Sequence, residues 1–270
     1  MVKQTKRHVA VHAGRRRRRI VIKIGGKSLA TSDLIRRAAS LIAKESSSND
    51  IVVVVSAPGE TTSSLVSLLS GIDRGVDGRH WDSVLSYGEV ISASILSVAL
   101  HGMGVRSVLL DPRSESWPII TDRNFGDADP IESKVRALCA KYVEPRLRLG
   151  YVVVMPGFVG RTLRNEISTM GRGSSDLTAF LMGKCIVADE VVKVTDVDGI
   201  YVRGKRVDSM SRSQLLDLCH NGVSRYEKPY SIIQLKALDY FQPPTIARVV
   251  SYKQIRIWRG GTVIYPGEKP

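Results

Sequence analysis

Three glycine-rich segments could hold an anion in this sequence of 270 residues. They are Lys23-Ile24-Gly25-Gly26-Lys27-Ser28, residues 56–62 (SAPGETT) and residues 171–176 (GRGSSD). Glycines let backbone N–H groups approach an anion closely, and the start of a following helix adds its dipole. Turns also need glycine for purely structural reasons. The three segments together favour a phosphate-binding site, while structural turns remain the alternative.

The Gly26-Lys27-Ser28 triplet looks like the end of a Walker A loop. That motif needs another glycine five residues before its second glycine, and Val21 stands at this position. The Walker A interpretation is therefore excluded.

Each glycine-rich segment follows a run of residues typical of a β-strand. Ile51 to Val55 is a continuous β-branched run, which predicts a strand buried on both faces. Strands alternating with helices predict an α/β fold with an open, mainly parallel sheet sandwiched by helices, and in such sheets ligands bind at the carboxyl ends of the strands. The expected strands are 20–24, 51–55, 105–110, 151–155, 190–194, 245–250 and 262–264. The expected helices begin near residues 33, 61, 82, 131, 174, 211 and 231, and the longest cover 82–101 and 131–149.

Positive charge is concentrated at the start of the chain. The net charge is +14, and residues 1–19 hold eight lysines and arginines, including the run Arg15 to Arg19, with no acidic residue. Such a run suits a solvated, disordered tail or an arm that holds nucleic acid. No aromatic residue interleaves it for base stacking, which favours the tail.

Other features bound the class of protein. The longest continuous apolar run is of strand length, and the basic start has no apolar region of a secretory signal, so we expect a cytoplasmic protein with no membrane contact. The three cysteines are far apart and odd in number, and the five histidines are scattered. This spacing predicts reduced thiols and no metal site built from protein nitrogen or sulfur.

Seven segments, in order, resemble motifs of the aspartate kinases of the amino-acid-kinase superfamily. They are 23–28 (KIGGKS), 53–62 (VVVSAPGETT), 87–92 (YGEVIS), 156–161 (PGFVGR), 169–176 (TMGRGSSD), 195–201 (TDVDGIY) and 260–264 (GGTVI). The resemblance covers about residues 20–264 and implies the amino-acid-kinase fold. It implies an acceptor lobe at about 20–178 and a nucleotide lobe at about 179–270, within a kinase domain of 20–270.

The resemblance also implies roles for single residues. Lys23 would lie against the transferred phosphate, and Asp176 would orient the catalytic lysines. The acceptor site would use Ser56, Thr62, Glu89, Arg172 and Ser175. The ATP site would use Lys23, Gly25, Gly26, Ser28, Thr195, Asp196, Tyr201, Arg206 and Lys228, the last in a segment that keeps the family pattern poorly.

The residue types suit transfer of a phosphoryl group to a carboxylate. A carboxylate is ionised at neutral pH and needs no general base, so the difficulty is to bring it up to another anion. Lysines, backbone N–H groups and Mg²⁺ neutralise the phosphoryl oxygens, and Mg²⁺ takes ligands from the phosphates of ATP, so no dedicated metal cage is expected. Arg172 can pair with an α-carboxylate, and Glu89 can pair with an α-ammonium.

The resemblance is incomplete at two places. Lys27 replaces a threonine of the family motif and adds a charge beside the glycine turn. The regulatory domains that follow the catalytic domain in many aspartate kinases do not occur within residues 20–270, so we expect no feedback inhibition by lysine or threonine through them.

The resulting expectation is an ATP-dependent aspartate kinase that forms 4-phospho-L-aspartate, the first step toward lysine, threonine and methionine, in a homodimer or other homo-oligomer. One alternative is a kinase of the same fold for another acceptor, such as glutamate, acetylglutamate, or a phosphate or phosphonate group. Another is a non-catalytic relative that binds nucleic acid through the basic tail.

Overall fold

The computed structural model describes residues 16–72, 77–220, 233–253 and 260–268. Within this part of the chain an eight-stranded sheet forms the centre of the molecule, in the order β11-β13-β12-β8-β1-β2-β5-β3. Its neighbouring strands are parallel except for the antiparallel pair β12–β13. The predicted open, mainly parallel sheet is confirmed. Its strands are β1 (Arg18–Ile24), β2 (Asn49–Val55), β3 (Ser107–Leu109), β5 (Val152–Pro156), β8 (Glu190–Thr195), β11 (Ser209–Ser211), β12 (Ile246–Ser251) and β13 (Thr262–Tyr265).

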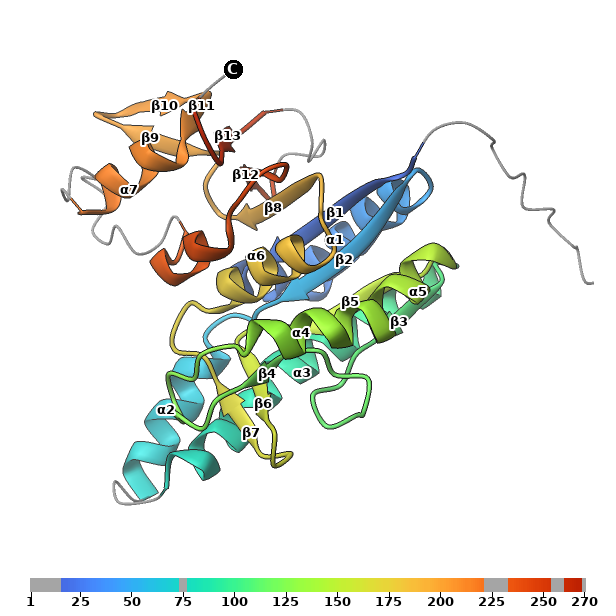
Figure 1. Ribbon diagram of the computed structural model, residues 1–270, viewed down its shortest axis with the longest axis vertical. Helices are drawn as coiled ribbons and strands as arrows, with labels where there is room; N and C mark the ends of the chain where they lie inside the picture. Colours follow the sequence, from blue (N-terminus) through green and yellow to red (C-terminus); the bar gives the residue numbers. More distant parts are fainter. Residues whose placement is uncertain (1–15, 73–76, 221–232, 254–259, 269–270) are drawn as a thin grey trace, which may run out of the picture.

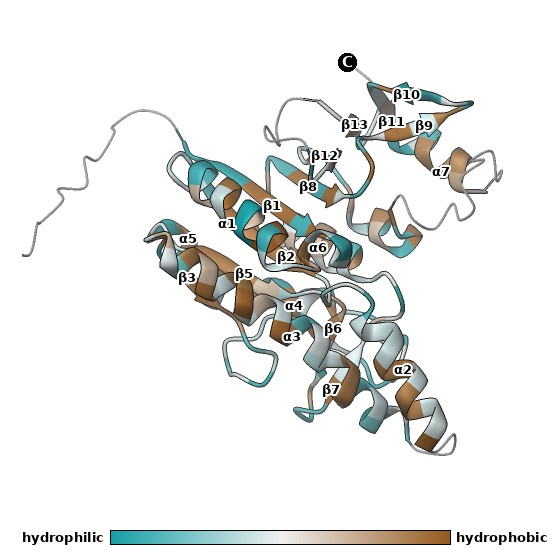
Figure 2. Ribbon diagram, turned by 180° about the vertical axis from the view of Figure 1, so that it is seen from behind, coloured by the Kyte–Doolittle hydropathy of each residue, from teal (hydrophilic) through white to brown (hydrophobic). Residues whose placement is uncertain are grey.

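Helices cover both faces of this sheet (Figure 1). Alternate residues of one strand belong to different cores: Ile51, Val53 and Val55 pack with α1 (Ser32–Ser46) and α3 (Gly78–Gly102). Val52 and Val54 pack on the other side with α4 (Glu132–Leu138), α5 (Glu144–Arg148) and α6 (Ser175–Cys185). The continuous β-branched run therefore fills two cores at once, as its sequence predicts. In Figure 2 the ribbon of β5 and of the strands beside it is accordingly coloured mostly as hydrophobic.

The remaining elements lie around the ends of the sheet. Helix α2 (Thr61–Ile72) follows β2, α7 (Arg212–His220) follows β11, and 3-10 turns span Gly26–Leu29 and Leu235–Tyr240. Two small sheets are added, one of β4 (Ile120–Thr121), β6 (Val159–Thr162) and β7 (Ile167–Thr169), the other of β9 (Ile200–Val202) and β10 (Lys205–Val207).

Helix α3 is the one helix of the described residues that is long and apolar enough to cross a membrane by length and composition. Half of its most apolar window is buried inside the protein, where Ala93, Leu96 and Leu100 pack in the core. The helix that covers a sheet in a folded domain meets the same criteria, so this finding is weak evidence for a membrane span.

Two predicted helices differ from the observed ones. The segment expected as one helix over 131–149 contains a π-helical turn, Cys139–Val143, between α4 and α5. Pro145 stands at the start of α5 and has no N–H to donate to the preceding turn, which accounts for the break. The helix expected from residue 231 is observed only as the 3-10 turn Leu235–Tyr240, and residues 231–232 lie outside the described part of the chain.

The arginine run is partly built into the fold. Strand β1 begins at Arg18, not Ile20, and Arg18 forms an ion pair of 2.8 Å with Glu190. Arg16 pairs with Asp189, and Arg17 pairs with Asp50 at 2.7 Å. The tail prediction is therefore wrong for Arg16 to Arg19. Carboxylates at the amino ends of neighbouring strands pair with the first three side chains, and the carbonyl of Ile186 accepts from Arg19. Residues 1–15 lie outside the described residues.

Candidate active site

The glycine-rich turns meet at the carboxyl edge of the sheet, where β1, β2, β5 and β8 end side by side. Backbone hydrogen bonds join them: the N–H of Gly25 donates to Val194, and the N–H of Ser56 donates to Ile24. A Cβ at Gly26 would lie 2.2 Å from the carbonyl oxygen of Ala57, so only glycine lets the two turns approach this closely. Gly173 has a φ of +85°, which other residues rarely adopt, and it leads into α6.

Two lysines share one carboxylate at this edge. The Nζ atom of Lys23, near the end of β1, lies 3.2 Å from Oδ1 of Asp176 in the first turn of α6. The Nζ atom of Lys193, on β8, lies 2.7 Å from Oδ2 of the same carboxylate. The Lys23 contact is an ion pair without the direction of a hydrogen bond, whereas Lys193 donates a hydrogen bond, as does the N–H of Gln234 at 3.2 Å. All three charged side chains are at most 11% exposed.

The electrostatics of this cluster follow from its composition. Burial acts to raise the pKa of Asp176, but the charges of Lys193 and Lys23 outweigh it and hold the pKa below its ordinary value. Burial lowers the pKa of the Lys193 ammonium, against the effect of Asp176. Two lysines and one carboxylate leave one excess positive charge in a buried place, which suits a phosphate anion.

Lys193 was not among the residues singled out from the sequence. Its signal was a single lysine inside the apolar strand run Glu190 to Val194, at a position that pairs with Lys23 across β1 and β8. A lysine inside a strand buried on both faces costs free energy unless it is paired, so it is a candidate functional residue. The register with β1 could only be read from the fold.

The predicted acceptor residues are brought together in part. Thr62 and Arg172 line a cavity of about 260 Å³ with Trp81, Asp82 and Phe158. Ser175 is buried at the start of α6, and Ser56 is half-buried at the end of β2. These positions surround the same edge of the sheet that holds Lys23.

Glu89 is buried on α3 and does not line this cavity. Its Oε1 accepts a hydrogen bond of 3.2 Å from the N–H of Ala57, and its buried Oε2 has no hydrogen-bond partner among the described residues. Burial raises the pKa of Glu89 to about 7, while the Ala57 N–H, the Thr62 hydroxyl and the charge of Lys23 act in the opposite direction.

Asp82 is a further buried carboxylate, and the sequence did not reveal it. It accepts hydrogen bonds from the N–H and the hydroxyl of Thr169, both at 2.7 Å, and from the N–H of Gly126 at 2.9 Å. Burial raises its pKa against these hydrogen bonds. Asp82 therefore ties α3 to the loops on the far side of the cavity.

The predicted nucleotide residues form two neighbouring groups. Near the glycine turn, Lys27 pairs with Asp196 at 2.9 Å, and the hydroxyl of Thr195 donates to the same carboxylate. The hydroxyl of buried Ser28 has no hydrogen-bond partner in the part of the chain that the structure describes. Tyr201 and Arg206 are partners across β9 and β10 and both contact Asp198. Lys228 lies outside the described residues.

The charge of Lys27 pairs with a carboxylate that the sequence could not identify as its partner. Its hydrogen bond to Asp196, with the charge of that carboxylate, raises the pKa of Lys27. The hydrogen bond from Lys27 likewise lowers the pKa of Asp196. The pair joins the glycine turn after β1 to the turn after β8, so the replacement of the family threonine adds a contact between two predicted nucleotide-binding segments.

Several groups of this site are suited to the phosphates of a nucleotide. The buried positive excess at Lys23 and Lys193, the unpartnered Ser28 hydroxyl and the close turns at Gly25 and Gly26 suit phosphate oxygens. Within the described residues no group of three or more histidine, cysteine, aspartate or glutamate side chains could hold a metal ion.

Comparisons with known proteins agree with this geometry. Residues 18–227 match the model of the amino acid kinase family. The aspartokinase of Rickettsia conorii is 31% identical over 267 residues, an alignment that covers 89% of this chain and 63% of that protein.

Solved structures extend the comparison to the fold. Aspartokinase III of E. coli, in complex with aspartate and ADP, superposes with a TM-score of 0.78 and 24% identity over 93% of this chain and 65% of that one. N-acetylglutamate synthase from Neisseria gonorrhoeae, complexed with coenzyme A and N-acetylglutamate, superposes with a TM-score of 0.67 and 14% identity, covering 94% of this chain and 61% of that one. The chain spans less than two thirds of the length of each of these relatives.

Proposed function

The chain belongs to the amino acid kinase family, and from this premise we propose that it transfers the γ-phosphoryl group of ATP to the side-chain carboxylate of L-aspartate. The product would be 4-phospho-L-aspartate, the opening intermediate toward lysine, threonine and methionine. One observation carries the proposal: Lys23 and Lys193 lie on either side of Asp176 at the edge of the sheet where the glycine turns meet.

The reaction brings two anions together, and this chain's side chains offset their repulsion. Lys23 and Lys193 would contact the phosphoryl oxygens, because Asp176 holds both ammonium groups but neutralises only one charge. The N–H groups of the glycine turn after β1 would add dipoles directed at the same oxygens. Mg²⁺, bound to the phosphates, would neutralise further negative charge.

Acceptor and nucleotide would then occupy the two predicted lobes. The acceptor would bind near Arg172 and Thr62, with Arg172 pairing with its α-carboxylate. The nucleotide would bind beside Thr195, Asp196, Tyr201 and Arg206, where Lys27 already crosses between the turns. Bound ATP would compete with Asp196 for the ammonium group of Lys27.

The position of Glu89 favours a second class of acceptor. Its carboxylate is buried, does not line the cavity with Arg172, and has a pKa of about 7, so among the described lining residues a free ammonium group finds no carboxylate except the buried Asp82. Asp82 in turn is committed to three hydrogen bonds. An acceptor whose amine is acylated, such as N-acetylglutamate, fits this arrangement.

Hydroxylamine trapping separates the two acceptors. The protein is incubated with ATP, Mg²⁺ and hydroxylamine, with L-aspartate, L-glutamate or N-acetyl-L-glutamate offered one at a time. We expect the hydroxamate to form with aspartate. A hydroxamate from N-acetylglutamate alone would move the acceptor to the second class and leave the kinase in place. If no ADP formed with any of the three acceptors, the acyl-phosphate proposal would be contradicted.

A further inference from the structure

A second cavity, of about 580 Å³, lies beside a different face of α3 from the Arg172 cavity. It is bounded by the start of α3, the loop after β3 and the β6–β7 hairpin. The residues that line it are Arg79, His80, Ser83, Arg113, Glu115, Arg161, Asn165, Glu166 and Ile167. Three arginines therefore surround a space of the size that small-molecule ligands occupy.

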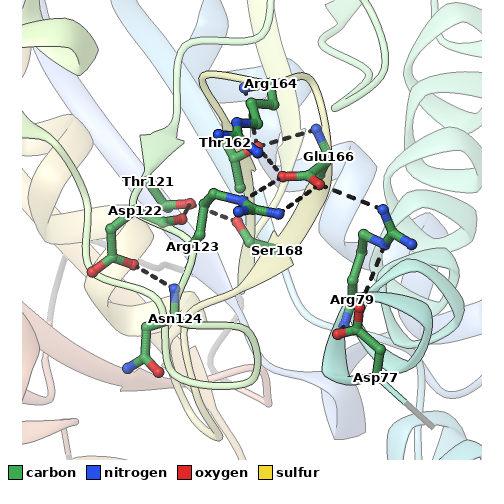
Figure 3. A network of polar contacts seen from close by, with 10 residues as sticks. All are labelled: Asp77, Arg79, Thr121, Asp122, Arg123, Asn124, Thr162, Arg164, Glu166 and Ser168. Carbon is green, nitrogen blue, oxygen red and sulfur yellow. Dashed lines mark hydrogen bonds and ion pairs between the residues drawn. The ribbon is translucent and has the colours of Figure 1, made fainter.

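The lining holds two carboxylates, Glu115 and Glu166. Glu166 already pairs with Arg123, which does not line the cavity. Glu166 accepts two hydrogen bonds from Arg123, at 2.8 and 3.0 Å, and a third from the Thr162 hydroxyl at 3.0 Å. Arg79 reaches the same carboxylate from α3 at 3.5 Å (Figure 3). Arg79 also lies 3.8 Å from Asp77, so Asp77 and Glu166 are shared between Arg79 and Arg123, and the contacts of Arg79 are the longer ones.

The other two arginines form no ion pair with a carboxylate of the described residues. Within the described residues neither Arg113 nor Arg161 forms an ion pair within 4.0 Å, and neither does Glu115. Arg161 donates from one terminal nitrogen to the carbonyl of Ser114 at 2.7 Å, and its Nε is buried without an acceptor. Burial lowers the pKa of Arg161. Glu115, in the same lining, acts on Arg161 through its charge but forms no ion pair with it, so a partly buried guanidinium remains that can take a direct anionic partner.

Arg113 is held in place by neutral groups. Its guanidinium lies 4.2 Å from the centre of the Tyr87 ring and donates to the Ser86 hydroxyl at 3.2 Å. Stacking on an aromatic ring fixes the plane of the guanidinium without consuming its charge. The side chain is thus positioned while its charge stays available.

We propose that this cavity binds a small phosphorylated anion. Arginine forks match the oxygens of a phosphate group through paired hydrogen bonds, and Arg79, Arg113 and Arg161 bring three of them to one space. Glu115, an exposed residue of the lining, disfavours an anion that would fill the whole cavity. The expected occupant is a metabolite with one or two phosphate groups.

The cavity shares structural elements with the Arg172 cavity. Arg79, His80 and Ser83 of α3 line the new cavity, while Trp81 and Asp82 line the other. Strand β7 gives Ile167 to the new cavity and Thr169 to the other. Occupation of the new cavity should therefore change the KM for the acceptor. This effect on KM rests on the proposed function, whereas binding of the anion to the cavity is independent of it.

Isothermal titration calorimetry with inorganic pyrophosphate, at low ionic strength, tests the binding. Arg113→Gln is the main variant, because this exposed side chain makes only a stacking contact and one hydrogen bond to a hydroxyl. Loss of one charge-assisted contact should weaken binding about tenfold. Arg161→Lys, which keeps the charge but not the fork, should also weaken it. Arg36→Gln, on α1 and paired with Asp33, is the matched control and should bind as the unaltered protein does.

The outcomes separate the possible sites. Pyrophosphate that binds all four proteins equally would be held elsewhere, at the glycine turns for example, and would overturn the proposal. Absence of binding to the unaltered protein would overturn it as well. Weaker binding by Arg113→Gln together with an unchanged acceptor KM in the presence of pyrophosphate would support the site and reject the coupling to the acceptor.

Discussion

At the scale of single residues, the arrangement that matters is the imbalance around Asp176. A carboxylate with one lysine would be neutral, and a lysine alone in this buried place would lose its charge more readily. With two lysines, the cluster keeps a positive excess and each ammonium has a counter-charge. The cost of burying these groups is offset within the cluster, and the excess remains for a ligand.

Replacement of Lys193 by methionine tests this arrangement. Lys193→Met leaves Lys23 and Asp176 as a neutral pair, so kcat should fall by about 10²–10³-fold, the effect typical of losing one transition-state donor. Lys134→Met, on the exposed side of α4, is the matched control and should leave kcat unchanged. Circular dichroism checks that both variants fold. A folded Lys193→Met protein with kcat within twofold of the original would contradict the role of the excess charge.

Glu89 predicts a pH dependence of stability. In the folded protein its pKa is about 7, above the ordinary value of 4.5, so the unfolded chain ionises first as the pH rises. The unfolded chain gains from this ionisation between pH 4.5 and 7, and the folded protein becomes less stable by up to about 3 kcal/mol above pH 7. Glu89→Gln removes this loss. Urea unfolding should find the variant more stable than the original at pH 8 and nearly equal at pH 5.

The control for Glu89 is Glu60→Gln, an exposed position in the turn before α2. It should change stability little at either pH. If Glu89→Gln had the same free-energy difference at pH 5 and pH 8, the raised pKa would be refuted.

At the scale of elements, the turns after β1 and β2 are held so close that one position admits only glycine. A Cβ at residue 26 would meet the carbonyl oxygen of Ala57 at 2.2 Å and that of Gly59 at 3.2 Å. The turns carry Gly25, Ser28 and Ser56, so the same contact that demands glycine also places predicted binding residues.

Gly26→Ala should therefore cost stability and function together. We expect a loss of about 1–3 kcal/mol, as for other overpacked sites, and weaker ATP binding because the turns must separate. Gly71→Ala is the matched control: among the described residues no atom beyond its own stretch of helix lies within 4 Å of the new Cβ, and it lies in α2, where alanine is the better helix former. Thermal unfolding should rank the control at or above the original protein. Equal stability of the two variants would show that the turns can move apart freely.

At the scale of the whole molecule, the positive charge is distributed differently from the sequence-based expectation. Arg17 pairs with Asp50 and donates to the carbonyls of Ser46, Ser47 and Asn49, where α1 ends and β2 begins. Arg18 and Arg19 reach Glu190 and the carbonyl of Ile186. Part of the arginine run therefore ties the first strand to its neighbours, and fewer charges are left for nucleic acid.

Arg17→Gln measures the weight of these contacts. Arginine at the end of a helix satisfies its last carbonyls, but the side chain is 40% exposed, so we expect a modest loss of about 1 kcal/mol in the free energy of unfolding. Arg36→Gln, which breaks an exposed ion pair inside α1, should lose less than half as much. Equal losses would mean that the arginine run contributes no more than an ordinary surface charge.

The sequence by itself determined the class of fold and the glycine turns. Alternating apolar runs dictate which strands are buried, and runs such as Ile51 to Val55 can only be satisfied between two layers of helices. The resemblance to family motifs at the glycine turns likewise marked Lys23, Arg172 and Asp176. Local patterns also misplaced the boundaries at Pro145 and Arg18, where one residue or a distant carboxylate overrides periodicity.

Only the tertiary structure decided which charges meet. Lys193 joins Lys23 because β8 lies beside β1 in register, although 170 residues separate the two lysines in the sequence. Strand order depends on the packing of all the layers together, and no local pattern encodes it. The same holds for the burial of Glu89, the pairing of Lys27 with Asp196 and the three arginines around the second cavity, since pKa values and charge balance depend on neighbours in space.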